Sequence, residues 1–229
     1  MLIGHFAIGL AAKRVSPRTS IGTLFAAAQL ADLIWPVLLM VGVETVRVDP
    51  GNTAFTPLDF VSYPWTHSLL MACFWAAGFA LAYRARTKWT RGAWVVAVLV
   101  LSHWVLDMVT HHPDLPLAPG AVKVGLGLWN SVAATVIVEG SLFAFGVFVY
   151  ATTTRARNRI GRLAFWALVI FLVAIYIANM VGPPPPSARA VSLVTLLMWL
   201  FIPWGVWIDR NRETVGASES RADGTTASS

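Results

Sequence analysis

Six long apolar runs constrain this chain more than any other feature of its sequence. Each run is close to or above the ~20 residues that a helix needs to cross the ~30 Å hydrocarbon layer of a membrane. None alternates between apolar and polar residues in the way that the strands of a membrane β-barrel require. The runs therefore predict an all-α fold, a polytopic membrane bundle with six transmembrane helices. They cover residues 21–43, 64–83, 92–110, 124–150, 163–181 and 190–208.

The two ends of the chain differ from these runs. Residues 2–12 have helical character but are too short to span a membrane, so we expect a short half-helix packed among the other helices. Lys13 and Arg14 follow this segment instead of preceding it, which is not the order found in a secretory signal peptide. The last residues are polar and small, which predicts a disordered cytoplasmic tail. The expected domains are a transmembrane domain over 1–208 and a tail over 209–229.

Basic residues are distributed unevenly among the connections between the runs. A net charge of +6 would by itself suggest nucleic acid, but all except three of the 17 basic residues lie in alternate connections or the tail. This asymmetry is the positive-inside pattern, which places the C-terminus in the cytoplasm and connections 44–63, 111–123 and 182–189 outside. Lipid, not nucleic acid, is therefore the expected partner. The clusters are Lys13, Arg14 and Arg18; Arg84, Arg86, Lys88 and Arg91; Arg155, Arg157, Arg159 and Arg162; and Arg210, Arg212 and Arg221.

Ionisable side chains inside the predicted spans are the first indication of function. Such groups are costly in hydrocarbon and have to face a partner or a wet cavity. His103 and Asp107 are four residues apart and His111 adds four more, so the three share one face of a helix. Neutral imidazole and carboxylate are suitable ligands for zinc or a similar divalent ion. Further candidate ligands on other segments are His5, Asp32, His67 and Glu139.

The expected depths of these residues favour convergence at one site. His103 lies about 12 Å and Asp107 about 6 Å from the outer end of their span, because a helix rises 1.5 Å per residue. His67 is near the same membrane face in its own run. We therefore expect a polar cluster in the outer half of the bilayer. Asp114, beyond the end of the span, is expected in a solvated loop.

The segments around these residues resemble a known family. G-H-F-A-x-G at 4–9, LADLIWP, THSLL and SHWVLDMVTHHPD are similar to sequences of the bacterial inner-membrane metal-dependent hydrolases described as LexA-binding. The resemblance runs from Gly4 to about Glu139 and implies metal-assisted hydrolysis. It implies as metal ligands His67, His103, Asp107 and Asp32, with His5 as a ligand or supporting donor and Glu139 as a ligand or general base.

The order of these residues is also similar to that in zinc-dependent phospholipases C and related single-strand nucleases. Thr135 stands where those enzymes have their last histidine, and no N-terminal tryptophan is present to chelate zinc through its amine. The resemblance therefore implies one or two metal ions instead of three. It implies a lipid or phosphoester substrate in the outer half of the bilayer, with Asp107 and Glu139 as catalytic residues and His111 as an additional metal ligand.

Two other interpretations fit the same residues. Intramembrane carboxylates and histidines could form the relay of a proton or metal-ion transporter, but the inner halves of most runs contain almost no charge. A non-catalytic membrane protein could use His103 and Asp107 only to hydrogen-bond two helices together. The metal-dependent hydrolase accounts for the ordered histidine and acidic residues more fully than either alternative.

Overall fold

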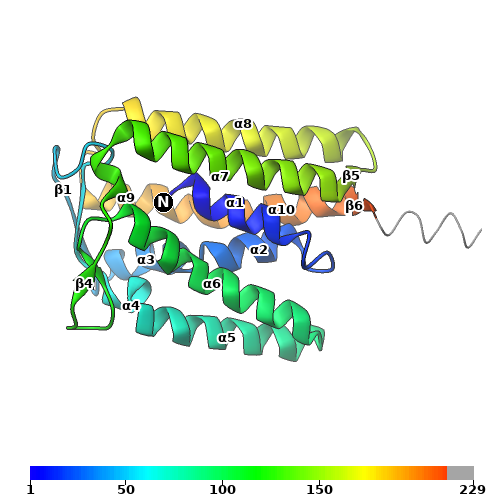
Figure 1. Ribbon diagram of the computed structural model, residues 1–229, viewed down its shortest axis with the longest axis horizontal. Helices are drawn as coiled ribbons and strands as arrows, with labels where there is room; N and C mark the ends of the chain where they lie inside the picture. The colour runs from blue at the N-terminus through cyan, green and yellow to red at the C-terminus, as the bar shows by residue number, and fades with distance from the viewer. Residues whose placement is uncertain (216–229) are drawn as a thin grey trace, which may run out of the picture.

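The computed structural model describes residues 1–215, which form a bundle of helices that run mostly parallel or antiparallel to one another (Figure 1). Within this part of the chain, four helices are long and apolar enough to cross a membrane. Ser131, Asn158 and Ser187 begin three of them, because each side chain accepts a backbone N–H of the first turn. The four are α6 (Thr90–Thr110), α7 (Val132–Thr153), α8 (Arg159–Val181), and the stretch that joins α9 (Ala188–Leu196), η2 (Leu197–Leu200) and α10 (Phe201–Arg210).

The first expected span is a bent pair of helices. Helix α2 (Ile21–Ala28) and helix α3 (Leu30–Met40) meet at 58°, and the pair counts as a fifth candidate span if it is taken as one. The break lies at Gln29, whose backbone (φ −108°, ψ 12°) leaves the helical region. An unbroken helix would use the carbonyl of Ala28 internally, whereas the break leaves that oxygen available to a side chain.

The run at 64–83 does not form one continuous helix. It contains the single turn α4 (Pro64–His67) and helix α5 (Leu69–Thr87), separated by Ser68 in extended conformation. Arginines enter the last turn of α5, so this helix is not among the four that are apolar enough to span. Six spanning helices are thus not established by length and composition, because the described residues provide four, or five with the bent pair.

Helix α1 (Ile3–Ala12) lies inside the bundle and not at its edge (Figure 1). Phe6, Ala7 and Leu10 are buried in the main hydrophobic core, which α2, α6, α7, α8 and α10 complete. Gly146 of α7 faces the backbone of Ala7, where a Cβ atom would lie 2.7 Å from the Ala7 Cα. A residue without a side chain is what allows these two helices to approach so closely.

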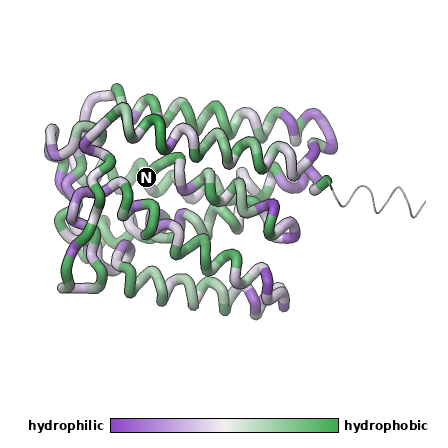
Figure 2. The backbone as a smooth tube through the Cα atoms, viewed as in Figure 1, coloured by the Kyte–Doolittle hydropathy of each residue, from purple (hydrophilic) through white to green (hydrophobic). Residues whose placement is uncertain are grey.

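The two ends of the bundle differ in character (Figure 2). One end, called the hairpin end here, has two small antiparallel pairings and the turn η1 (Leu128–Asn130). The other, called the basic end, brings together the arginine and lysine clusters around residues 13–18, 84–91, 155–162 and 210–214. The pairings of the hairpin end are β1 (Thr45–Val48) with β2 (Leu58–Ser62), and β3 (Leu115–Pro116) with β4 (Lys123–Val124).

Ion pairs join the segments of the basic end. Lys13 Nζ lies 2.7 Å from Asp209 Oδ2, and the exposed Arg155 lies 3.1 Å from Glu213. The third two-stranded pairing, β5 (Thr154–Ala156) with β6 (Arg212–Thr214), lies beside them. The described helix and strand thus extend past the expected boundary at residue 208, where Asp209 contacts Lys13, Ile21 and Tyr150 and β6 pairs with β5. Residues 216–229 of the expected tail lie outside the described residues.

Candidate metal centre

Asp107, in the last turns of α6, lies at the centre of a buried polar cluster. Its Oδ2 is 3.1 Å from His103 Nε2, one turn earlier on the same helix. Its Oδ1 is 3.0 Å from His5 Nε2 and 2.7 Å from the amino nitrogen of Met1. The rings of His5 and His103 are stacked, with centroids 3.8 Å apart. Helix α1 thus brings His5 against the face of α6 that, as their spacing predicted, carries both His103 and Asp107.

A second group of donors shares His103 with the first. His67 Nε2, from α4, is 3.3 Å from Asp32 Oδ1 and 3.9 Å from Asp107 Oδ2. His103 Nε2 is 3.8 Å from the same Asp32 oxygen. In each of the two groups, His5–His103–Asp107 and Asp32–His67–His103, the ligand atoms lie within 4.8 Å of one another. Five residues of the expected site therefore converge, although they come from α1, α3, α4 and α6.

Hydrogen bonds fix which ring nitrogen of two histidines carries the proton. His103 Nδ1 lies 2.8 Å from the carbonyl oxygen of Ala28, which only accepts, so Nδ1 donates. His67 Nδ1 lies 2.6 Å from the hydroxyl of Thr66, whose own proton goes to Glu44. In the neutral form of each ring, Nε2 then presents its lone pair to the cluster, where His67 Nε2 lies 3.3 Å from Asp32 Oδ1. Among residues 1–215, His103 Nε2 has no hydrogen-bond partner.

The break between α2 and α3 explains part of this arrangement. It frees the Ala28 carbonyl to orient His103, and it places Asp32 in the first turn of α3. His5, His103 and Asp107 are almost fully buried, whereas Asp32 is partly exposed at the cluster's open side. Two carboxylates in an apolar bundle are costly unless a cation or several donors compensate their charge.

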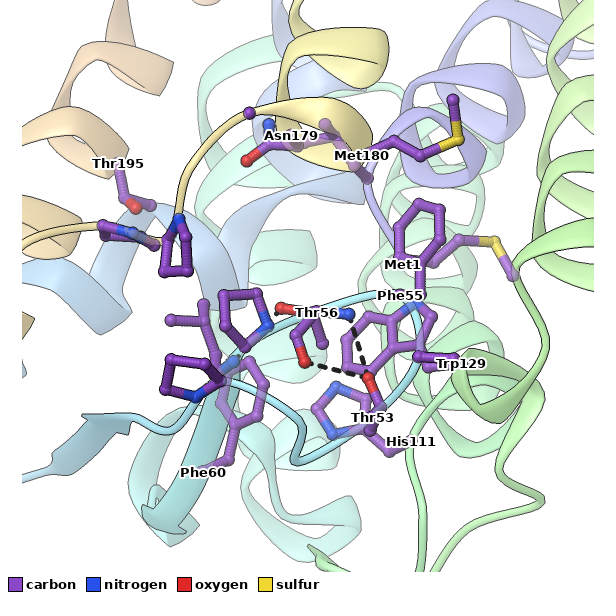
Figure 3. A pocket seen from close by; sticks show the side chains of 18 of the residues that line it. Met1, Thr53, Phe55, Thr56, Phe60, His111, Trp129, Asn179, Met180 and Thr195 are labelled. Atoms are coloured by element: carbon purple, nitrogen blue, oxygen red, sulfur yellow. Dashed lines mark hydrogen bonds between the residues drawn. The ribbon is translucent and has the colours of Figure 1, made fainter.

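A cavity of about 450 Å³ opens from this cluster toward the hairpin end (Figure 3). Asp32, His67 and Asp107 line its polar part, together with the amino end of the chain. Aromatic rings form much of the remaining wall, and the proline-rich connection after α8 contributes to it. None of these lining residues is lysine or arginine. The aromatic residues are Trp35, Phe55, Phe60 and Trp129.

His111 lines the cavity but lies outside both donor groups. Its Nδ1 is 2.9 Å from Asp114 Oδ1, and the hydroxyl of Tyr63 donates to the same carboxylate oxygen. Burial lowers the pKa of His111, and burial together with Asp114 raises the pKa of Tyr63. Asp114 was expected in a solvated loop, but it is only 6% exposed because Tyr63 and His111 cover it.

Glu139 also lies apart from the two donor groups. Its Oε2 accepts the backbone N–H groups of Leu2 and Ile3, at 2.9 and 3.1 Å. These belong to the start of α1, where helix N–H groups have no intrahelical partner. Glu139 therefore anchors the helix that carries His5, and its role as a general base stays a prediction.

Glu44 is a part of the site that the sequence did not reveal. Its buried carboxylate accepts three hydrogen bonds from Trp65 and Thr66, beside His67. Glu44 lies between two predicted spans and 22 residues before Thr66, so no local spacing connects them. The THSLL segment indicated His67 as a candidate ligand, but it gave no sign that a carboxylate from another part of the chain contacts it.

Comparison with protein families shows the family to which the chain belongs. The model of the YdjM inner membrane protein family matches residues 1–182, which include every residue of the cluster. The chain therefore belongs to this family. No curated protein and no solved structure matches the chain.

Proposed function

We propose that this member of the YdjM inner membrane protein family is a membrane-embedded metal-dependent hydrolase. One observation carries the proposal: the Nε2 atoms of His67 and His103 face the carboxylate oxygens of Asp32 and Asp107, while the Nδ1 atoms already have hydrogen-bond partners. In neutral rings each of these Nε2 atoms carries a lone pair. Acceptors that face each other repel, and a cation held between them removes the repulsion. Imidazole nitrogen and carboxylate oxygen are the donors that suit zinc.

The spacing of the donors supports the same proposal. Tetrahedral zinc with bonds of about 2.0–2.1 Å separates its ligand atoms by about 3.3 Å. The four Nε2-to-oxygen distances among His67, His103, Asp32 and Asp107 are 3.1, 3.3, 3.8 and 3.9 Å. These four side chains would hold the ion. Both donor groups use the single Nε2 of His103, which favours one ion, with His5 supporting Asp107 from the other oxygen.

A divalent ion would supply Lewis acidity, which polarises an ester or phosphoryl oxygen and acidifies water. The chain's own residues would bind and orient the substrate. The cavity places a reacting group beside Asp32 and Asp107, while its aromatic and proline walls cover an apolar part and exclude water. A lipid or a phosphoester with an apolar portion suits such a mixed wall.

The direction of insertion follows from the charges. Cytoplasmic connections are rich in lysine and arginine, so we assign the basic end to the cytoplasm. The cluster lies toward the hairpin end, because Asp107 is near the end of α6 and shares a cavity with the loop between β1 and β2. We therefore place the reaction in the outer half of the bilayer. In this topology α5 crosses beside α6 as a sixth span, and α1 reaches only part of the way.

Metal analysis of the purified full-length protein tests the proposal. We expect about one zinc ion per chain, lost in His103→Ala and after chelation, together with hydrolysis of a lipid ester or phosphoester that zinc restores. Cys73→Ala, at an exposed thiol outside the cluster, serves as the matched control and keeps both properties. Less than about 0.1 ion per chain in protein dialysed against zinc would refute the proposal.

Two other outcomes would favour a different function. Ion flux into liposomes that disappears in Asp107→Asn, without hydrolysis, would indicate a transporter. Loss of folding in His103→Ala, with no metal bound by the wild type, would indicate a structural polar cluster.

A further inference from the structure

Glu44 is a buried carboxylate with an unusually complete set of donors. It follows α3 and directly precedes β1, and it is 2% exposed. Its Oε1 accepts the backbone N–H groups of Trp65 and Thr66 at 2.8 and 2.9 Å. Its Oε2 accepts the hydroxyl of Thr66 at 2.7 Å. All three donors belong to the turn that ends in His67.

The hydroxyl of Thr66 is hydrogen-bonded to both the Glu44 carboxylate and the ring of His67. A hydroxyl has one proton, and here that proton is given to Glu44. The Thr66 oxygen therefore acts as the acceptor toward His67 Nδ1, 2.6 Å away. A neutral His67 ring then carries its proton on Nδ1, and its Nε2, 3.3 Å from Asp32 Oδ1, keeps the lone pair that a metal ion would bind. Partners of this kind fix the tautomer of metal-binding histidines and strengthen them as ligands.

We infer that Glu44 is a positioning residue, which sets the tautomer of His67 through Thr66 and so prepares Nε2 to bind the metal ion. The inference rests on the proposed function for the identity of the ion, but the tautomer can be measured without it. Glu44 also directly precedes the β1–β2 hairpin, whose loop lines the cavity, so its side chain lies between the hairpin and His67.

The variant Glu44→Gln tests whether Glu44 sets the tautomer of His67 or only holds the turn of α4 in place. In Glu44→Gln the amide oxygen can still accept from the two backbone N–H groups. The amide nitrogen, however, donates to Thr66 Oγ1 instead of accepting from it. The Thr66 hydroxyl then gives its proton to His67 Nδ1, and the proton of the ring moves to Nε2. The direction of the hydrogen bonds is reversed while the fold is kept.

The experiment uses the full-length protein in detergent with ¹⁵N-labelled histidine, first stripped of metal and then titrated with zinc. In the wild type, the ring-nitrogen shifts of His67 should report the Nδ1–H tautomer. In Glu44→Gln they should report Nε2–H, and the zinc affinity should fall about 10–100-fold. Thr66→Val should weaken zinc binding in the same way, whereas Thr66→Ser keeps the hydroxyl and retains it. Asp49→Asn, an exposed carboxylate of the same hairpin, is the matched control and should change neither property.

The possible results distinguish the two proposals. If Glu44→Gln leaves both the tautomer and the zinc affinity unchanged, the positioning role is wrong and the metal site stands. If His67 carries protons on both nitrogens in the metal-free wild type, the positioning role is also wrong. If the tautomer changes as expected but the wild type binds no zinc, the hydrogen-bond relay stands and the metal site is wrong.

Discussion

The contact of α1 with α7 at Gly146 links helix packing to the proposed metal centre. A Cβ atom added at Gly146 would meet the carbonyl oxygen of Ala7 and lie 2.7 Å from its Cα. Both are backbone atoms, so no side-chain rotation can relieve the clash. Restoring an ordinary contact of 3.4 Å to the Ala7 Cα requires the two backbones to separate by at least about 0.7 Å, and the closer carbonyl oxygen requires more. His5 is on α1, two residues before Ala7, and moves with it.

We therefore expect Gly146→Ala to lower both stability and metal affinity. Overpacking of this kind costs about 1–3 kcal/mol. Metal sites tolerate displacements of about 0.5 Å, so moving His5 away from Asp107 should weaken zinc binding about tenfold. Unfolding in detergent measures the first effect, and zinc titration measures the second.

Gly140, on the same helix, provides the control. Within residues 1–215, no heavy atom of another segment lies within 4 Å of a Cβ added there. Gly140→Ala therefore raises the free energy of unfolding only by the gain in helix propensity, up to about 1 kcal/mol, and Gly146→Ala includes the same gain. If the two variants unfold alike and bind zinc alike, the close approach of α1 and α7 does not position His5, and this reasoning is refuted.

Three further predictions concern other parts of the molecule. Asp107→Asn removes the charge that faces His103 and should reduce bound zinc to below about 0.1 ion per chain, whereas Asp59→Asn on β2 should retain it. Asp209→Asn should lower the free energy of unfolding by about 3 kcal/mol, because buried Lys13 loses its carboxylate; Glu213→Gln, at exposed arginines, should have little effect on thermal unfolding. Burial lowers the pKa of His111, so the stability present above its unperturbed value of 6.5 is lost as the pH falls. The midpoint of thermal unfolding should thus fall less between pH 7.5 and 5 in His111→Gln than in the wild type, and an equal fall would contradict this assignment.

Much of the helical bundle was predictable because membrane spans are encoded locally. A run of apolar residues long enough to cross the hydrocarbon layer has to satisfy its backbone within the segment, and a helix does so. The runs at 92–110, 124–150, 163–181 and 190–208 correspond to the four long helices. The run at 64–83 was mispredicted as one helix, because hydropathy does not register the extended residue Ser68 between α4 and α5.

The candidate site was predictable only where its members share one helix. The i, i+4 spacing of His103 and Asp107 is a property of helical geometry, and it placed both on one face. The same spacing suggested His111 as a third ligand, but His111 follows the end of α6 and pairs with Asp114 instead. Glu139 was recognised as an ionisable residue inside a span, but its contact with the start of α1 could not be read from its own helix.

The sequence by itself therefore determined that the chain forms apolar helices and that its basic residues gather at one end of the bundle. It also determined that ionisable groups, which are costly in hydrocarbon, lie inside the helices. Tertiary structure alone decided which of these groups meet. The contacts that build the cluster join residues 102, 35 and 22 positions apart, from His5 to Asp107, from Asp32 to His67, and from Glu44 to Thr66. The close approach of α1 to α7 positions His5, and the break at Gln29 positions Asp32; both depend on packing between helices that no local pattern records.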